Sequence, residues 1–252
     1  MATTTFPASS AENELTQRVA ANLAALRARI SAAGRDPSSV RVVAVTKTFG
    51  PEAVLAAWAA GLGAVGENYL VELETKRAAL GELAVAWHYL GALQSNKIAR
   101  VAAVADVICS LSRVKEIDRL RELASISKLY VQVDFTRAPE RNGADPSDVG
   151  ALVARARADG LAVCGLMTVA PADPAGAARA FEETARLADA LALEERSMGM
   201  SDDLELACRW GSTEVRVGRA LFGPRPPRAA HPSPNMGEPV APRGEMHERQ
   251  DT

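Results

Sequence analysis

Short apolar runs rich in β-branched residues alternate with helical segments along most of the chain, and this alternation limits the fold more than any other feature. RVVAVTK at 41–47 and KLYVQVD at 128–134 are typical of buried strands. Helices between consecutive strands imply parallel pairing, because the chain has to cross back along the sheet before the next strand begins. Strands are predicted at 41–47, 64–66, 87–91, 106–111, 128–134, 161–167, 197–200 and 213–218.

Each of these strands except the last is followed by a predicted helix. A first helix, at 14–33, precedes them, because apolar residues recur there every three or four positions. Eight such units suggest a closed (β/α)8 barrel of the TIM type, and we predict one α/β barrel over residues 13–223. An open doubly wound sheet is the alternative, but the first strand-to-helix loop, KTFGP, lacks the G-x-G-x-x-G fingerprint. The later helices are predicted at 51–60, 69–80, 95–104, 114–123, 146–159 (capped by Asp145), 175–193 and 201–210.

The two ends of the chain differ from the middle in composition. Residues 1–12 are rich in Ser, Thr and Ala, and residues 224–252 contain many prolines and polar residues without apolar periodicity. We predict that both ends are disordered, because such segments cannot bury enough apolar surface to form a core. The start has no apolar stretch typical of a signal peptide, and no run approaches the roughly 20 apolar residues of a membrane span. We therefore expect a cytoplasmic protein with no membrane contact.

Charge and composition argue against several classes of protein. The net charge is -2 and aromatic residues make up 4% of the chain, so neither a basic surface nor stacking platforms for nucleic acid are expected. The three cysteines, Cys109, Cys164 and Cys208, are odd in number and show no CxxC spacing, which argues against a disulfide framework and against a zinc site. Cys109 and Cys164 lie in apolar runs and are predicted to be buried.

One lysine lies where parallel barrels carry their chemistry, at the C-terminal end of a strand. Lys47 ends the run VVAVTK. Burial in the barrel mouth would lower the pKa of its amine, because the charged form loses hydration, and a neutral amine can form a Schiff base with an aldehyde. An exposed lysine at the end of a strand is the alternative, and the residues alone leave both interpretations open.

The segment GSTEVRVG at 211–218 has features of a phosphate site. Its small residues allow backbone N–H groups to approach a phosphate, and Ser212 and Thr213 add hydroxyl donors. Barrels frequently bind phosphate near their seventh and eighth strands, although a Gly-Ser-Thr turn is also a common loop. Arg216 can point into the barrel mouth as a cation. His88, the one histidine of residues 13–223, is interpreted as a hydrogen-bonded core residue rather than a catalytic one.

Six longer motifs occur in order along the chain: VAVTKTFGPEAVLAAWAAG, GENYLVELETK, WHYLGALQSNK, GLMTVAP, SMGMSDDLELA and GSTEVRVGRALFG. Together they resemble the pyridoxal phosphate homeostasis protein family, which is similar in fold to the N-terminal domain of alanine racemase. The resemblance runs from about residue 14 to Gly223. Two connections, at 121–128 and 193–197, look shorter than is usual in that family.

This resemblance implies a barrel that holds pyridoxal 5′-phosphate (PLP) as a Schiff base on Lys47. Asn68 would lie beside the cofactor, and Arg216 would face the pyridine nitrogen. An arginine there keeps that nitrogen unprotonated, which weakens the ring as an electron sink. The residues implied around the phosphate are Ser201, Ser212, Thr213 and Gly218.

The implied function is PLP homeostasis without significant catalysis, with PLP and the apo forms of PLP-dependent enzymes as partners. A racemase-like enzyme is the main alternative. Racemisation needs an acid or base on each face of the substrate carbon, and alanine racemase takes one of them from a second β-domain, which we do not expect after Gly223. A PLP-free Schiff-base enzyme such as an aldolase and a pure interaction module are further alternatives.

Overall fold

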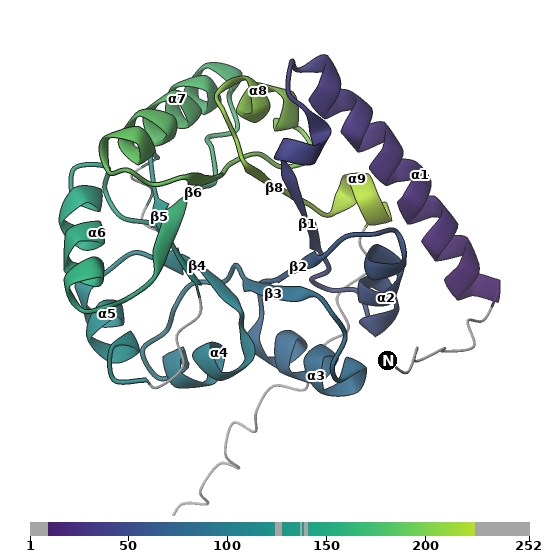
Figure 1. The fold of residues 1–252 in the computed structure, drawn as a ribbon, viewed down its shortest axis with the longest axis horizontal. Coiled ribbons are helices and arrows are strands. Elements are labelled where there is room, and N and C mark those ends of the chain that lie inside the picture. Colours follow the sequence, from purple (N-terminus) through teal and green to yellow (C-terminus); the bar gives the residue numbers. More distant parts are fainter. Residues whose placement is uncertain (1–9, 124–127, 137, 139–140, 225–252) are drawn as a thin grey trace, which may run out of the picture.

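Eight parallel strands form a closed barrel in which neighbours in sequence are neighbours in the sheet (Figure 1). The computed structural model describes residues 10–123, 128–136, 138 and 141–224. β1 pairs with β8 from Arg41 opposite Glu214 to Ala44 opposite Val217, so the sheet closes on itself. The predicted (β/α)8 barrel is confirmed and the open sheet is excluded. The strands are β1 (Arg41–Val45), β2 (Ala64–Glu67), β3 (Ala86–Tyr89), β4 (Val107–Leu111), β5 (Lys128–Val133), β6 (Val163–Thr168), β7 (Glu195–Ser197) and β8 (Glu214–Val217).

Helices surround the barrel and cover its outer face (Figure 1). They are α1 (Ser10–Ala32), α2 (Pro51–Ala59), α3 (Leu70–Leu80), α4 (Ile98–Val104), α5 (Val114–Leu120), α6 (Val149–Ala158), α7 (Pro174–Ala190), α8 (Leu204–Arg209) and α9 (Arg219–Phe222). Contrary to the prediction, the last strand is also followed by a helix. This short helix, α9, is held against α1, because Asn22 donates from Nδ2 to the carbonyl of Leu221 at 2.8 Å.

The main core lies between the sheet and the helices. Outward-facing strand residues such as Val42, Ala44 and Val65 are buried there together with Leu23 of α1. Side chains alternate along a strand, so the neighbours of these residues face the inside of the barrel. Arg41 shows this directly, because its guanidinium contacts side chains of other strands across the interior.

Two element boundaries differ from the prediction for local reasons. α6 begins after Asp148 rather than at residue 146, because Asp145 accepts hydrogen bonds from the N–H and the hydroxyl of Ser147 and forms a separate turn. β7 covers 195–197 rather than 197–200, since the chain turns at Gly199, which has a φ of 95°. A Cβ at this glycine would lie 2.6 Å from the Cβ of Ala207, so the turn packs too closely for a side chain.

The two connections that look short in the sequence lead into β5 and β7. Residues 124–127, in the first of them, lie outside the described residues. β7, after the second, has three residues and pairs with β8 only between Ser197 and Glu214. Both strands are nevertheless formed within the closed sheet, so the short connections do not interrupt the barrel.

Of the two predicted disordered ends, the structure describes only the residues at the start of the first helix. α1 begins at Ser10, so residues 10–12 are helical rather than disordered. Residues 1–9 and 225–252 lie outside the described residues. Within the described part of the chain, no helix is both long and apolar enough to cross a membrane.

Candidate functional site

Lys47 and Asn68 follow neighbouring strands at the C-terminal face of the barrel. β1 ends at Val45, two residues earlier than predicted, so Lys47 belongs to the loop before α2. Val45 is the register partner of Gly66, and the N–H of Thr46 donates to the carbonyl of Gly66 at 3.0 Å. Lys47 and Asn68 each come two residues after this pair, so both lie beyond the C-terminal ends of their strands.

A buried polar network lies behind the loop that carries Lys47. The amine of Lys76, on α3, donates to the carbonyl of Thr46 at 2.8 Å and forms an ion pair with Glu67 Oε1 at 2.6 Å. The hydroxyl of Thr46 donates to the same carboxylate oxygen at 2.6 Å. This network fixes the residue before Lys47 against β2 and α3.

The charges of this network are out of contact with water. Glu67 and Lys76 are both buried, and Glu67 Oε2 has no hydrogen-bond partner among the described residues. Burial raises the pKa of Glu67, and the charge of Lys76 opposes that shift. Removing either partner would therefore leave the other as an uncompensated buried group.

Thr48, directly after Lys47, has a backbone conformation that is rare for a β-branched residue. Its φ is 71°, in the left-handed region. Its N–H donates to Glu72 Oε2 at 2.7 Å, which holds this conformation. Its hydroxyl oxygen is buried and has no hydrogen-bond partner within the described ranges. Backbone strain and an unpaired buried hydroxyl are often found where a protein binds a ligand.

Arg216, on β8, reaches across the barrel to the last residues of β6 and β7. Its Nη1 donates to the carbonyl and hydroxyl oxygens of Ser197, each at 2.7 Å, and its Nη2 donates to the carbonyl of Thr168 at 2.7 Å. The side chain is buried, and burial lowers the pKa of the guanidinium. These contacts place the guanidinium inside the barrel, and its role toward a ligand at the barrel mouth stays a prediction.

Ser201 and Gly218 come together beyond the C-terminal ends of β7 and β8. The Oγ of Ser201 accepts a hydrogen bond at 3.2 Å from the N–H of Ala220, two residues after Gly218. Arg29, on α1, donates from Nη2 to the carbonyl of Ser201 at 2.9 Å and forms a two-pronged ion pair with Glu205. A helix outside the barrel therefore positions Ser201.

The structure contradicts the predicted phosphate role of Ser212 and Thr213. The N–H of Arg41, at the start of β1, donates to the carbonyl of Thr213, so both residues lie at the N-terminal end of the barrel. β1 extends from Arg41 to Val45, which is about 13 Å along the strand direction, and Lys47 follows beyond its C-terminal end. Ser212 is fully buried, and its hydroxyl lies 2.7 Å from the carbonyl oxygen of Met198. Both side chains connect β8 to the segment of β7 instead of facing the mouth.

No role was predicted for the buried ion pair, although the sequence of α3 contains a signal for it. Leu70, Leu73 and Lys76 recur every three residues and are the buried residues of this helix. A lysine on the apolar face of a helix is rarely buried without a partner. The helical spacing therefore pointed to a buried lysine, whereas its partner Glu67 is identified only by the packing of α3 on β2.

Comparisons with known proteins define the class of this barrel. The sequence matches the family described as "Alanine racemase, N-terminal domain" over residues 16–226. The solved structure of PipY from Synechococcus elongatus PCC7942 with PLP bound is 35% identical and superposes with a TM-score of 0.71, covering 81% of this chain and 100% of that chain. Fold and site thus define a barrel of the alanine racemase N-terminal class.

Relatives of similar length narrow the class to one family. The pyridoxal phosphate homeostasis protein of Pseudomonas aeruginosa is 41% identical over 221 residues, which cover 82% of this chain and 96% of that protein. The protein of the same name from Escherichia coli K12 is 36% identical over 228 residues, which cover 82% of this chain and 97% of that protein. The chain belongs to the pyridoxal phosphate homeostasis protein family.

Proposed function

We propose that this chain binds PLP at the C-terminal end of its barrel and takes part in PLP homeostasis. The observation that carries the proposal is the PLP-bound PipY structure, which is 35% identical and is covered over its whole length. The relatives named pyridoxal phosphate homeostasis protein add independent support.

The donors at this end of the barrel suit PLP, which presents an aldehyde, a phosphate and a pyridine nitrogen. Lys47 supplies an amine. The Oγ of Ser201 accepts from Ala220, and its hydroxyl hydrogen is not used in that contact, so it can donate to a phosphate. Gly218 lies close by, and a residue without a Cβ lets the backbone approach an anion. The buried hydroxyl of Thr48 provides a further polar group next to Lys47.

Lys47 is the proposed point of covalent attachment. Condensation of a neutral lysine amine with the PLP aldehyde forms a C=N bond and releases one water. Lys76 is also near this loop, but its amine is buried and bonded to Glu67 and Thr46. Asn68, which follows β2 as Lys47 follows the neighbouring β1, is proposed to contact the cofactor.

Arg216 is proposed to face the pyridine nitrogen. A guanidinium has five N–H donors and does not give up its proton in proteins. The contacts with Ser197 and Thr168 use three of these donors, so others are left for a ligand. A ring nitrogen that accepts from Arg216 stays unprotonated, and the ring then withdraws electrons weakly. This favours storage of PLP over carbanion chemistry.

A protein of this kind keeps a reactive aldehyde from other amines and releases it to the apo forms of PLP-dependent enzymes in the cytoplasm. Such a protein has to bind and release PLP and does not need to convert a substrate. We therefore propose that this chain is not an enzyme. The names of the relatives support homeostasis as its role.

Five lysines make the attachment site simple to map: Lys47, Lys76, Lys97, Lys115 and Lys128. The protein is incubated with PLP, reduced with borohydride and digested, and the labelled peptide is identified by mass spectrometry. We expect label on Lys47, and loss of both the label and the visible absorption band in Lys47→Ala. Lys97→Ala is the matched control and should retain both.

Two results would count against these assignments in different ways. Label on another lysine of the wild-type protein would refute the choice of Lys47 while leaving PLP binding intact. Absence of any PLP-dependent absorption band in the folded wild-type protein would refute the proposed function itself.

A further inference from the structure

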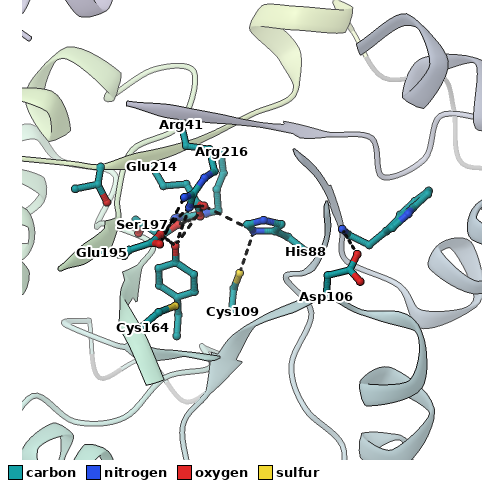
Figure 2. Close-up of polar contacts among 12 residues, drawn as sticks. Arg41, His88, Asp106, Cys109, Cys164, Glu195, Ser197, Glu214 and Arg216 are labelled. Carbon is teal, nitrogen blue, oxygen red and sulfur yellow. Dashed lines mark hydrogen bonds and ion pairs between the residues drawn. The ribbon is translucent and has the colours of Figure 1, made fainter. Parts of the chain in front are cut away.

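The inside of the barrel is polar at its N-terminal end, whereas barrels of this type are usually filled with branched apolar side chains. In Figure 2, His88 and Cys109 point toward a group of charged residues that come from the opposite wall. We call these side chains the interior polar cluster: Arg41 (β1), His88 (β3), Cys109 (β4), Tyr130 (β5), Glu195 (β7) and Glu214 (β8).

Within this cluster, Glu195 makes the shorter contacts with the available donors. Arg41 Nη1 lies 2.6 Å from Glu195 Oε2, and the hydroxyl of Tyr130 donates to the same oxygen. The same two groups reach Glu214 Oε2 only at 3.1 and 3.3 Å. Glu214 Oε1 accepts from Ser197 Oγ at 2.7 Å. Tyr130 gives its single hydroxyl hydrogen to Glu195, so Oε2 of Glu214 keeps the hydrogen bond from Arg41 at 3.1 Å and retains a lone pair for another partner.

His88, Cys109 and Glu214 face one another beside this oxygen. His88 Nδ1 lies 3.7 Å from Cys109 Sγ and 3.8 Å from Glu214 Oε2, and the three donor atoms lie within 4.8 Å of one another. The first two distances are long for strong hydrogen bonds. They are close to the separations around a tetrahedral ion with bonds of about 2.0–2.3 Å, which are about 3.6 Å for sulfur and nitrogen and about 3.3 Å for nitrogen and oxygen.

A cavity of about 730 Å³ at the N-terminal end of the barrel extends as far as His88. This end is opposite the loop that carries Lys47. His88 is part of the cavity wall, whereas Cys109 and Glu214 are fully buried and do not line the cavity, so His88 is the first of the three ligands that an entering ion would meet. Four residues of the interior polar cluster line the cavity, namely Arg41, His88, Tyr130 and Glu195, and Cys164 lies beside them.

We propose that His88, Cys109 and Glu214 bind a divalent transition-metal ion, with Zn²⁺ as the ion that suits them best. Imidazole nitrogen, thiolate sulfur and carboxylate oxygen are the donors that zinc uses in proteins, and three protein ligands leave a fourth position open. Binding forms a metal–sulfur bond in place of the S–H bond and releases the thiol proton to solvent.

The charges in and around the cluster affect how firmly this site would hold an ion. Burial lowers the pKa of His88, which favours an imidazole with a lone pair, and raises the pKa of the Cys109 thiol, which disfavours loss of its proton in the absence of an ion. Arg41 and Arg216 already balance the charges of Glu195 and Glu214, so an ion adds one net positive charge after the thiol proton leaves. This extra charge favours an ion that exchanges with solution over one that is permanently bound.

Co²⁺ is the probe for this site, because it occupies zinc sites and absorbs visible light. Co²⁺ is added to the full-length, untagged protein, which keeps the PLP that is bound after purification. Free PLP is removed first, because it chelates metals. We expect one ion per chain, with a thiolate-to-cobalt charge-transfer band that is lost when Zn²⁺ is added. A histidine or carboxylate site elsewhere gives no thiolate band. Absence of the band from folded protein at saturating Co²⁺ would overturn the proposal.

Cysteine variants identify the sulfur ligand. Loss of an outer-shell partner typically costs about 10–100-fold in metal affinity, so Cys109→Ser should weaken Co²⁺ binding at least about tenfold and remove the thiolate band. Cys208→Ser, on α8 outside the barrel, is the matched control and should keep the band. A band that persists in folded Cys109→Ser would show that Cys109 is not a ligand.

A second measurement uses only the wild-type chain, so it tests the proposal even if Cys109→Ser does not fold. Zn²⁺ should slow alkylation of Cys109 by iodoacetamide severalfold, as followed by peptide mass spectrometry. The alkylation of Cys208 reports any general stabilisation of the fold by Zn²⁺, and its rate should fall much less. Equal protection of the two cysteines, or none, would contradict a site at Cys109.

Discussion

The amine of Lys76 lies 2.6 Å from Glu67 Oε1, and neither side chain of this ion pair is more than 4% exposed. The same amine donates to the carbonyl of Thr46, the residue before Lys47. A buried ion pair adds little net stability, because desolvation of both charges offsets their attraction. Its position behind the loop indicates that it serves to hold Lys47 in place.

Removal of one partner from this pair should destabilise the fold strongly. Lys76→Met or Glu67→Gln leaves a buried polar group without its partner and should lower the free energy of unfolding by about 3–5 kcal/mol. The double variant should lose less than the sum of the single losses, since no unpaired charge remains. Urea unfolding of the four proteins measures this coupling. The exposed pair Arg100–Glu74 is the control, for which simple additivity is expected.

The ion pair between Arg29 and Glu205 should make stability depend on pH in the acidic range. The hydrogen bond from Arg29 lowers the pKa of Glu205 below its ordinary value of 4.5. A lowered pKa in the folded state stabilises the protein above the unfolded value, and this stabilisation is lost as the pH falls through the lowered pKa. Glu205→Gln should therefore unfold at a lower temperature than wild type near neutral pH.

The same comparison at acidic pH checks the sign. The difference between Glu205→Gln and wild type should shrink toward zero at the most acidic pH at which both proteins remain folded. Calorimetry over the whole range gives the two curves. A difference that does not change with pH would mean that the carboxylate charge of Glu205 contributes nothing.

Ser201→Ala and Ser212→Ala should distinguish a PLP-binding role at one end of the barrel from a structural role at the other. Ser201→Ala removes a proposed phosphate donor and should weaken PLP binding by about 1.5–3 kcal/mol, the value of a hydrogen bond to a charged group. Ser212→Ala leaves the buried carbonyl of Met198 without its donor and should cost about 1–3 kcal/mol of stability, with PLP affinity unchanged. Absorption titration and thermal unfolding measure both. Equal losses of PLP affinity would show that Ser212 does face the phosphate.

Exchange of the α-hydrogen of alanine should be slow or undetectable. Arg216 is proposed to lie against the pyridine nitrogen, where it would disfavour a stabilised carbanion, and loss of one general base typically costs about 10²–10⁴-fold in rate. The PLP-loaded protein is incubated with L-alanine in heavy water, and both deuterium incorporation and D-alanine are followed. Turnover on the order of 10 s⁻¹, typical of an enzyme, would favour the racemase-like function over the carrier.

Local sequence patterns were enough to predict the barrel and the residues at its C-terminal face. Helix and strand periodicities depend on neighbours a few positions away, so the strand at 128–134 was recognisable without long-range information. A residue that directly follows a strand of a parallel barrel must lie at the C-terminal face. This rule placed Lys47 and Asn68 at the same face of the barrel, and the pairing of β1 with β2 shows that they follow neighbouring strands.

The error at Ser212 and Thr213 has a simple physical origin. GSTEVRVG was interpreted as one phosphate-binding segment, whereas β8 runs through it from Glu214 to Val217. A strand separates the residues before it from those after it by its own length. Gly218 therefore lies at the mouth, and the two hydroxyl residues lie at the opposite end, where they are already bonded to the β7 segment.

Contacts between distant strands could be seen only once the barrel had closed. His88 and Cys109 are 21 positions apart, and Glu214 lies on the last strand, so no spacing motif links them and the sequence argued against a zinc site. Their separations depend on strand register and on the number of strands that close the barrel. The pairing of Lys76 with Glu67 likewise depends on how α3 packs on β2. These quantities are properties of the whole sheet and its packing, which no window of neighbouring residues contains.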